Sequence, residues 1–140
     1  MTTPHRHFRK ISQDGRMLPA DASEWVAVLD TKSNLMWAVE VLPRQTFAAA
    51  GKSVRKLRTA GFADWRVPTI EELFCLADRT RRWPAIDTGY FPETPPDWFW
   101  SSTVDAASPS DYAWGVRFVN GSSDWVSQYY EGFVRAVRSA

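Results

Sequence analysis

The stretch G-F-A-D-W-R-V-P-T-I-E-E-L, residues 61–73, decides the fold of this chain. Pro68 ends an extended run, because its ring fixes φ and removes a backbone donor. Thr69 and Glu72 then match a capping box, in which the hydroxyl accepts an amide hydrogen and the carboxylate accepts the N–H of the cap residue. We therefore predict a helix that begins after Thr69. The residues at helical spacing on its core face are Ile70, Leu73, Phe74 and Ala77.

The residues before Pro68 are expected to cross the domain. Residues 62–67 carry two aromatic side chains and Arg66, whose guanidinium we expect to be buried. A buried charge without a partner is costly, so backbone carbonyls or a carboxylate should hold it. A basic amphipathic helix is predicted over residues 46–60, ending at Gly61. Its apolar stripe is Phe47, Ala50, Val54 and Leu57, and its basic side, interpreted as a solvated face, is Lys52, Arg55 and Lys56.

Strand patterns occupy both ends of the chain. Runs rich in β-branched and aromatic residues predict strands over residues 25–30, 35–39, 98–103, 112–119, 124–128 and 133–138. Asn120-Gly121 predicts a two-residue type I′ hairpin turn, which needs positive φ at both positions. Residues 84–97, with four prolines, predict a long irregular loop. Strands on both sides of two central helices indicate an α+β fold, with the last strand free to pair beside the first.

Length and charge limit the domain organisation and the partners. We predict an N-terminal arm over residues 1–23 and a single domain over residues 24–140. The net charge of +1 provides no field for nucleic acid, and the basic stretch 78–84 is short and balanced by acids. No apolar run approaches the roughly 18 residues of a membrane span. The N-terminus does not read as a secretion signal, so we expect a cytoplasmic or virion-associated protein.

Residues that support catalysis are scarce. Cys75 is the single cysteine and lies among core positions of the second helix, where a free cysteine acts as a small hydrophobe. His5 and His7 lie in the arm, and no second cluster completes a metal site with them. We therefore expect no catalytic residue, no metal and no cofactor. Eight tryptophans in 140 residues are unusual, and we expect most in the core and several at the surface or in a groove.

Six blocks of the sequence resemble the Lcl C-terminal domain family. The blocks are W-V-A-V-L-D-T-K-S-N-L-M-W at 25–37, residues 61–73, I-D-T-G-Y-F-P at 86–92, W-S-S-T at 100–103, W-G-V-R-F-V-N-G at 114–121 and V-R-A-V-R at 134–138. The resemblance implies a C-type-lectin-like fold, distantly related to formylglycine-generating enzymes. Two helices would pack on a small twisted antiparallel sheet, with the termini close together. Asn34 replaces the glycine that the family prefers in the first hairpin, and the calcium motifs of sugar-binding lectins are missing.

The resemblance also implies a ligand-binding role. Known relatives are often surface adhesins, some of which bind sulfated polysaccharide, and related folds form receptor-binding tips on phages. In such domains the late strands and their loops build the ligand surface. We assign Trp114, Val116 and Phe118 to the core. The predicted ligand-binding residues are Tyr112, Asp124, Trp125, Gln128, Tyr129 and Tyr130, whose side chains suit adaptable recognition.

These observations predict a non-catalytic module that recognises a protein or glycan, with phage-associated receptor binding as one form of that function. The alternative is an intracellular regulator, encoded by a phage or mobile element, that inhibits a host protein complex through the same face. An enzyme of the formylglycine-generating type is the least favoured hypothesis, since such enzymes rely on paired cysteines. A homo-oligomer is compatible with the sequence, whereas nucleic acid and membrane are not expected as partners.

Overall fold

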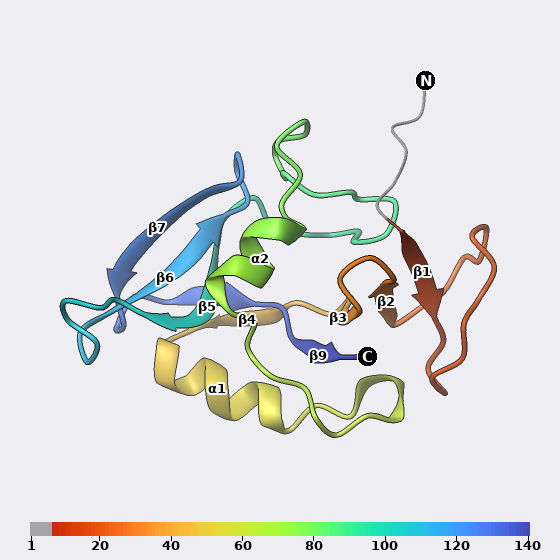
Figure 1. Cartoon of the computed structure of the whole chain (residues 1–140), viewed down its shortest axis with the longest axis horizontal. Coiled ribbons are helices and arrows are strands. Elements are labelled where there is room, and N and C mark those ends of the chain that lie inside the picture. Colours follow the sequence, from red (N-terminus) through yellow and green to blue (C-terminus); the bar gives the residue numbers. More distant parts are fainter. Residues whose placement is uncertain (1–6) are drawn as a thin grey trace.

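The chain forms two sheets and two α-helices, as the computed structural model of residues 7–140 shows (Figure 1). The first sheet has the order β1 (Phe8–Ile11), β2 (Ala27–Asp30), β3 (Leu35–Ala38) and β9 (Val137–Ser139). The second sheet has the order β4 (Leu42–Gln45), β8 (Gly132–Val134), β5 (Trp98–Val104), β6 (Tyr112–Arg117) and β7 (Ser122–Ser127). The helices are α1 (Phe47–Arg55) and α2 (Ile70–Leu76), with a short 3-10 helix η1 (Thr59–Gly61) between them. The α+β prediction is confirmed.

The division into two sheets differs from the single small antiparallel sheet that the resemblance implied. The predicted last strand breaks at Arg135 and Ala136, so β8 joins the second sheet and β9 joins the first. β9 pairs with β3 rather than with the first predicted strand, and β8 runs parallel to β5. The break occurs because the chain crosses between sheets, where the Ala38 N–H donates to the Ala136 oxygen at 3.0 Å.

Part of the predicted N-terminal arm is a strand. β1 pairs antiparallel with β2, because the side chains of Phe8 and Ile11 are buried in the core. Lys10 is also buried, and its ammonium donates to the Ala22 oxygen at 2.7 Å. His7 is exposed, and His5 lies outside the described residues. The prediction of an arm is therefore wrong for residues 8–11, of which only Arg9 is exposed.

The ends of the described chain meet at the β2–β3 turn. The Thr31 N–H donates to the His7 oxygen at 2.9 Å, and the Asn34 side-chain amide donates to the Ala140 oxygen at the same distance. Asn34 has a φ of 61°, the left-handed conformation that a short polar side chain tolerates. The expectation of neighbouring ends holds from His7 onward.

The capping box at the start of α2 is confirmed. The Glu72 N–H donates to Thr69 Oγ1 at 3.2 Å, and the Thr69 N–H donates to Glu72 Oε1 at 2.9 Å. The same carboxylate accepts Nη1 and Nη2 of Arg66 at 2.7 and 2.8 Å. The backbone of Arg66 also exchanges two hydrogen bonds with Val137, which ties this segment to β9. A carboxylate thus holds Arg66 as predicted, although its side chain is 40% exposed rather than buried.

The predicted core face of α2 is confirmed for Leu73 and Ala77 and for Ile70, which packs against the core, but it is wrong for Phe74. Leu73, Leu76 and Ala77 are buried, whereas Phe74 is 40% exposed. The Arg79 guanidinium covers the Phe74 ring at 3.6 Å from its centre, which shields its apolar surface at the edge of the helix. A helix of two turns has room for only one narrow buried stripe, so Phe74 falls outside it.

Helix α1 ends five residues before the predicted limit. Arg55 is its last residue, and Ala60 in the following 3-10 turn has a left-handed φ of 57°. Ala50 and Val54 are buried as predicted. The chain turns inward after α1 so that Trp65 can enter the core, where its indole N–H donates to the Thr59 oxygen at 3.1 Å.

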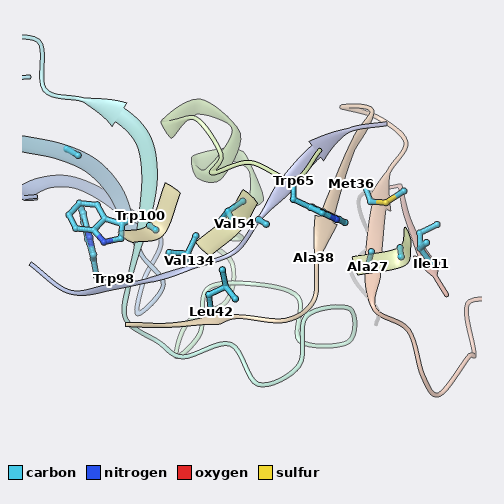
Figure 2. Packing of buried hydrophobic residues seen from close by; sticks show 14 residues of the cluster. Ile11, Ala27, Met36, Ala38, Leu42, Val54, Trp65, Trp98, Trp100 and Val134 are labelled. Atoms are coloured by element: carbon cyan, nitrogen blue, oxygen red, sulfur yellow. The ribbon is translucent and has the colours of Figure 1, made fainter. Parts of the chain in front are cut away.

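Two apolar clusters form the core, one on each side of the second sheet. The first extends from Trp98 and Trp100 through Val54 and Trp65 to Ile11, as Figure 2 shows. The Trp98 and Trp100 rings contact edge to face at 5.7 Å. The second cluster packs α2 against β5 and β6 and against the loop before β5. These clusters bury parts of β5 and β6, whereas the edge strand β7 remains exposed over most of its length.

One charged side chain lies fully inside this core. Arg135 is 1% exposed, and its Nη2 donates to Thr94 Oγ1 at 3.1 Å. Its guanidinium carbon lies 4.7 Å from the centre of the Phe91 ring. Nε and Nη1 have no hydrogen-bond partner within residues 7–140. Burial lowers the pKa of Arg135 to about 9, because the charged form loses its hydration.

Candidate functional site

Strand β7 is the outer edge of the second sheet and is exposed over most of its length. It pairs only with β6, in a register that places Trp125 opposite Trp114. Cross-strand partners share a face of the sheet, and the Trp125 ring contacts Tyr112 edge to face at 5.4 Å. Tyr112 and Trp125 are 37% and 47% exposed. The structure therefore brings these two predicted site residues together on the surface.

Tyr129 and Tyr130 lie in the turn that follows β7. They are 86% and 42% exposed, the first being the most exposed aromatic side chain of residues 7–140. The Tyr130 N–H donates to the Ser127 oxygen at 2.9 Å, and Ser127 pairs with Tyr112. Both tyrosines therefore sit at the same end of the hairpin as Tyr112. We call Tyr112, Trp125, Tyr129 and Tyr130 the aromatic surface.

Asp124 lies on the other face of the sheet. It pairs with Gly115, one position from Trp125, and side chains alternate between faces along a strand. Its carboxylate lies 3.8 Å from Arg117 Nη2 and accepts the Trp125 N–H at 2.8 Å. Asp124 thus orders the edge strand from the opposite side and does not share the ring contact. Arg117, which sequence reasoning did not single out, also covers Trp98 at 5.1 Å from the ring centre.

Gln128 connects the loop before β6 to the turn after β7. Its side-chain amide donates to the Pro109 oxygen at 2.9 Å and to the Tyr112 oxygen at 3.1 Å. Its backbone oxygen accepts the N–H of Phe47 at 3.1 Å, which joins the turn to the start of α1. These contacts give Gln128 a positioning role under the aromatic surface.

The β6–β7 loop has four residues, 118–121, so the predicted two-residue turn is wrong. Gly121 has a φ of 84°, but Asn120 does not have a positive φ. Phe118 is buried, and its oxygen accepts the Ala85 N–H at 2.8 Å. The core therefore draws Phe118 out of the ladder and lengthens the turn. Val116 is buried as predicted, whereas Trp114 is only half-buried because the outer part of this face is open.

Gly115 sets the spacing between β5 and β6 beneath the site. A Cβ at this position would lie 2.2 Å from the Phe99 oxygen and 2.6 Å from the Trp98 ring. Only glycine leaves room for the indole of Trp98 beside this strand. This close approach fixes β6, and through it the positions of Tyr112 and Trp125.

The expectations about metal ligands and about Cys75 can be compared with the described residues. No group of three or more His, Cys, Asp or Glu side chains there is placed to hold a metal ion. Cys75 is exposed rather than packed, because it lies on the outer side of the short α2 helix. The search for membrane spans, restricted to residues 7–140, finds no helix of sufficient length and apolar character.

Within residues 7–140, Arg81 is the arginine of the basic stretch 78–84 that pairs with carboxylates, those of Asp78 and Asp87. Arg81 Nε donates to Asp78 at 3.1 Å, and the Arg82 guanidinium lies 4.8 Å from the centre of the Trp83 ring. Trp83 is 67% exposed, and its N–H donates to the Val119 oxygen at 3.1 Å, in the β6–β7 loop at the opposite end of the hairpin from Tyr112. Trp83 and Trp125 are exposed and four of the eight tryptophans are buried, so half of them, rather than most, lie in the core.

Residues 26–138 match the Lcl C-terminal domain family, and this range contains every strand of the second sheet and both α-helices. No curated protein matches the chain in sequence. The match covers far more than half of the 140 residues. The chain therefore belongs to the Lcl C-terminal domain family.

Proposed function

We propose that this domain is a non-catalytic module that binds a protein or glycan ligand through the aromatic surface. One observation carries the proposal: exposed apolar side chains gather at this end of the second sheet. Four of the eight large hydrophobic side chains exposed in residues 7–140 are Tyr112, Trp125, Tyr129 and Tyr130. Tyrosine and tryptophan dominate the energetics of binding sites, because they bury a large rigid area at low entropy cost.

The edge position of β7 supports a protein as the first ligand class to test. The Trp125 N–H donates to its neighbour Asp124 and so points away from β6. Outward-facing groups alternate along an antiparallel edge, so Ser123 shares this orientation, and so does Ser127, whose oxygen accepts the Tyr130 N–H. An extended peptide can add to such an edge through its backbone, while aromatic residues beside it select side chains. β7 contains no proline or lysine that would block this approach.

The test is a pull-down from the native host with the full chain, followed by calorimetry with the captured ligand. We expect Trp125→Ala and Tyr129→Ala each to lose about 2 kcal/mol or more of binding free energy. Their unfolding free energies should change by only about 0.5 kcal/mol, because neither side chain is part of the core. Trp83→Ala is the matched control, since it removes an exposed indole elsewhere.

Undiminished binding by folded Trp125→Ala and Tyr129→Ala, or an equal loss in Trp83→Ala, would contradict the proposal. The nature of the captured ligand separates the two forms of the function. A cell-surface receptor or glycan supports receptor binding of the phage-associated type. An intracellular complex whose activity falls on binding supports the regulator.

A further inference from the structure

We infer that a groove between α1 and the segment before Pro68 binds an acidic peptide segment that carries an adjacent aromatic or aliphatic side chain. The α1 groove, as we call it, has a volume of about 550 Å³. One wall is Phe47, Gly51 and Arg55, and the other is Trp65, Arg66 and Val67. The inference is independent of the proposed function, because no residue of the aromatic surface lines this groove.

The groove exists because α1 has a glycine on the side that faces Trp65. Phe47, Gly51 and Arg55 are four residues apart and share one face of the helix. Glycine is unfavourable inside a helix, and Gly51 does not have the positive φ that would require it. A Cβ at position 51 would meet only Arg55 Nη2, at 3.9 Å. The fold therefore does not need glycine here, whereas an open groove does.

The charged residues that line the groove are both arginines. The two N–H···O bonds to Glu72 fix the guanidinium of Arg66, whose side chain remains 40% exposed. Arg55 is exposed, and within residues 7–140 no carboxylate pairs with its guanidinium. A guanidinium matches a carboxylate in shape and charge and binds it through two parallel hydrogen bonds. The unpaired Arg55 thus selects an anionic ligand.

The remaining lining favours a peptide over a glycan. Phe47, Trp65 and Val67 supply an apolar floor, and the groove's hydroxyl groups come from Thr69 and Ser102. Thr69 Oγ1 already accepts the Glu72 N–H in the capping box. A glycan needs several convergent polar groups, whereas an apolar side chain next to a carboxylate needs only this floor and Arg55. An acidic and apolar peptide segment is the occupant that matches both features.

The experiment compares two probes, acetyl-Phe-Asp-amide and acetyl-Phe-Asn-amide, which differ only in the carboxylate. Each is titrated into the ¹⁵N-labelled full chain, and the amide resonances of Gly51 and Arg55 report binding. We expect the Asp peptide to bind at least about tenfold more tightly than the Asn peptide. Arg55→Gln should abolish this preference, whereas Lys56→Gln, a change on the solvated side of α1, should leave it intact.

Gly51→Leu tests the cavity itself. Leucine favours a helix more than glycine does, so we expect an unchanged or higher melting temperature together with loss of binding of both peptides. Ala48→Leu, at an exposed position that also lines the groove, fills it from the same wall and provides a second variant. Trp125→Ala should leave peptide binding unchanged, which separates this site from the aromatic surface.

Several results would overturn the inference. They are no binding of either peptide, equal affinity for both, or undiminished binding in folded Gly51→Leu and Ala48→Leu. Equal losses in Lys56→Gln and Arg55→Gln would show a diffuse charge effect instead of a site. Displacement of the Asp peptide by a sulfated oligosaccharide that binds more tightly in the same groove would assign it to a glycan.

Discussion

The pair formed by Arg66 and Glu72 allows a direct measurement of what the central stretch contributes to stability. Glu72 accepts two hydrogen bonds from Arg66 and one from the Thr69 N–H, so it joins an extended segment to the start of α2. The perturbation is a double-mutant cycle with Arg66→Ala, Glu72→Gln and the double variant. Glutamine keeps one acceptor oxygen for the Thr69 N–H, so Glu72→Gln preserves the capping box but removes the charge and the acceptor of the Arg66 Nη2 bond.

The expected coupling follows from the exposure of the two side chains. Hydrogen bonds to charged groups contribute about 1.5–3 kcal/mol when buried, whereas exposed ion pairs contribute about 0–1 kcal/mol. The Arg66 side chain is 40% exposed and that of Glu72 is 20% exposed, so solvent screens the pair in part. Because the pair makes two hydrogen bonds, at 2.7 and 2.8 Å, but is partly screened, we expect a coupling free energy of about 1–2 kcal/mol. This is less than the about 3–5 kcal/mol of a fully buried pair.

The coupling should depend on pH in one direction. The hydrogen bonds from Arg66 are the main reason that the pKa of Glu72 lies below its ordinary value of 4.5, and burial acts against them. A lowered pKa in the folded state means that the pair stabilises the protein above about pH 4.5. This contribution is lost as the pH falls through the lowered pKa. The cost of Arg66→Ala should therefore be constant between pH 7 and pH 5.5 and should decrease as the pH falls below about 4.5 and through the lowered pKa of Glu72.

Urea unfolding followed by tryptophan fluorescence provides the free energies, and thermal melts provide a second measure. A change of 1 kcal/mol corresponds to about 3–5 °C in melting temperature at this chain length. A coupling indistinguishable from zero would show that the two hydrogen bonds contribute nothing net. A cost of Arg66→Ala that is unchanged at low pH would show that Arg66 acts through packing and not through the carboxylate.

Three further outcomes are expected. Arg135→Met should leave the urea unfolding free energy unchanged or raise it by about 1–2 kcal/mol, because burial lowers the pKa of Arg135 to about 9 and two of its nitrogens lack partners; a loss above about 3 kcal/mol would contradict this reasoning. Gly115→Ala should lower the unfolding free energy by about 3 kcal/mol or more, because the added Cβ would lie 2.2 Å from a backbone oxygen. The control Gly61→Ala should cost only about 1 kcal/mol, because Gly61 has a φ of 83° but open space around it. Cys75 should react with a thiol reagent in the native protein as fast as in urea, and protection in the native state would place it in the core.

The sequence by itself determined the features that depend on neighbours in the chain. The capping box joins residues three apart, so Thr69 and Glu72 could be identified without the fold. The Asn34 turn and the irregular loop before β5 were predictable for the same reason, since turn conformations follow from local side-chain chemistry. The α+β fold class followed from the strand patterns on both sides of two predicted helices, and the family blocks could be ordered along the chain.

For the candidate site, the sequence determined which residue types gather near the late strands but not which face each one occupies. Tyr112 and Trp125 meet on one face, whereas Asp124 lies on the other because of a register that only sheet pairing decides. Gln128 resembled a free polar side chain in sequence, yet distant backbone oxygens engage its amide. The same holds for Phe74, whose exposure depends on how α2 packs on β5 and β6.

Only the tertiary structure decided how the strands divide between two sheets and where the α1 groove opens. β1 forms because Phe8 and Ile11 bury against residues far along the chain, and the break at Arg135 arises because one chain segment must serve both sheets. In the sequence Gly51 is one residue of a predicted helix, and only the structure shows that it lines a groove together with Trp65. Such features depend on burial and on contacts between distant segments, and local pattern contains no measure of either.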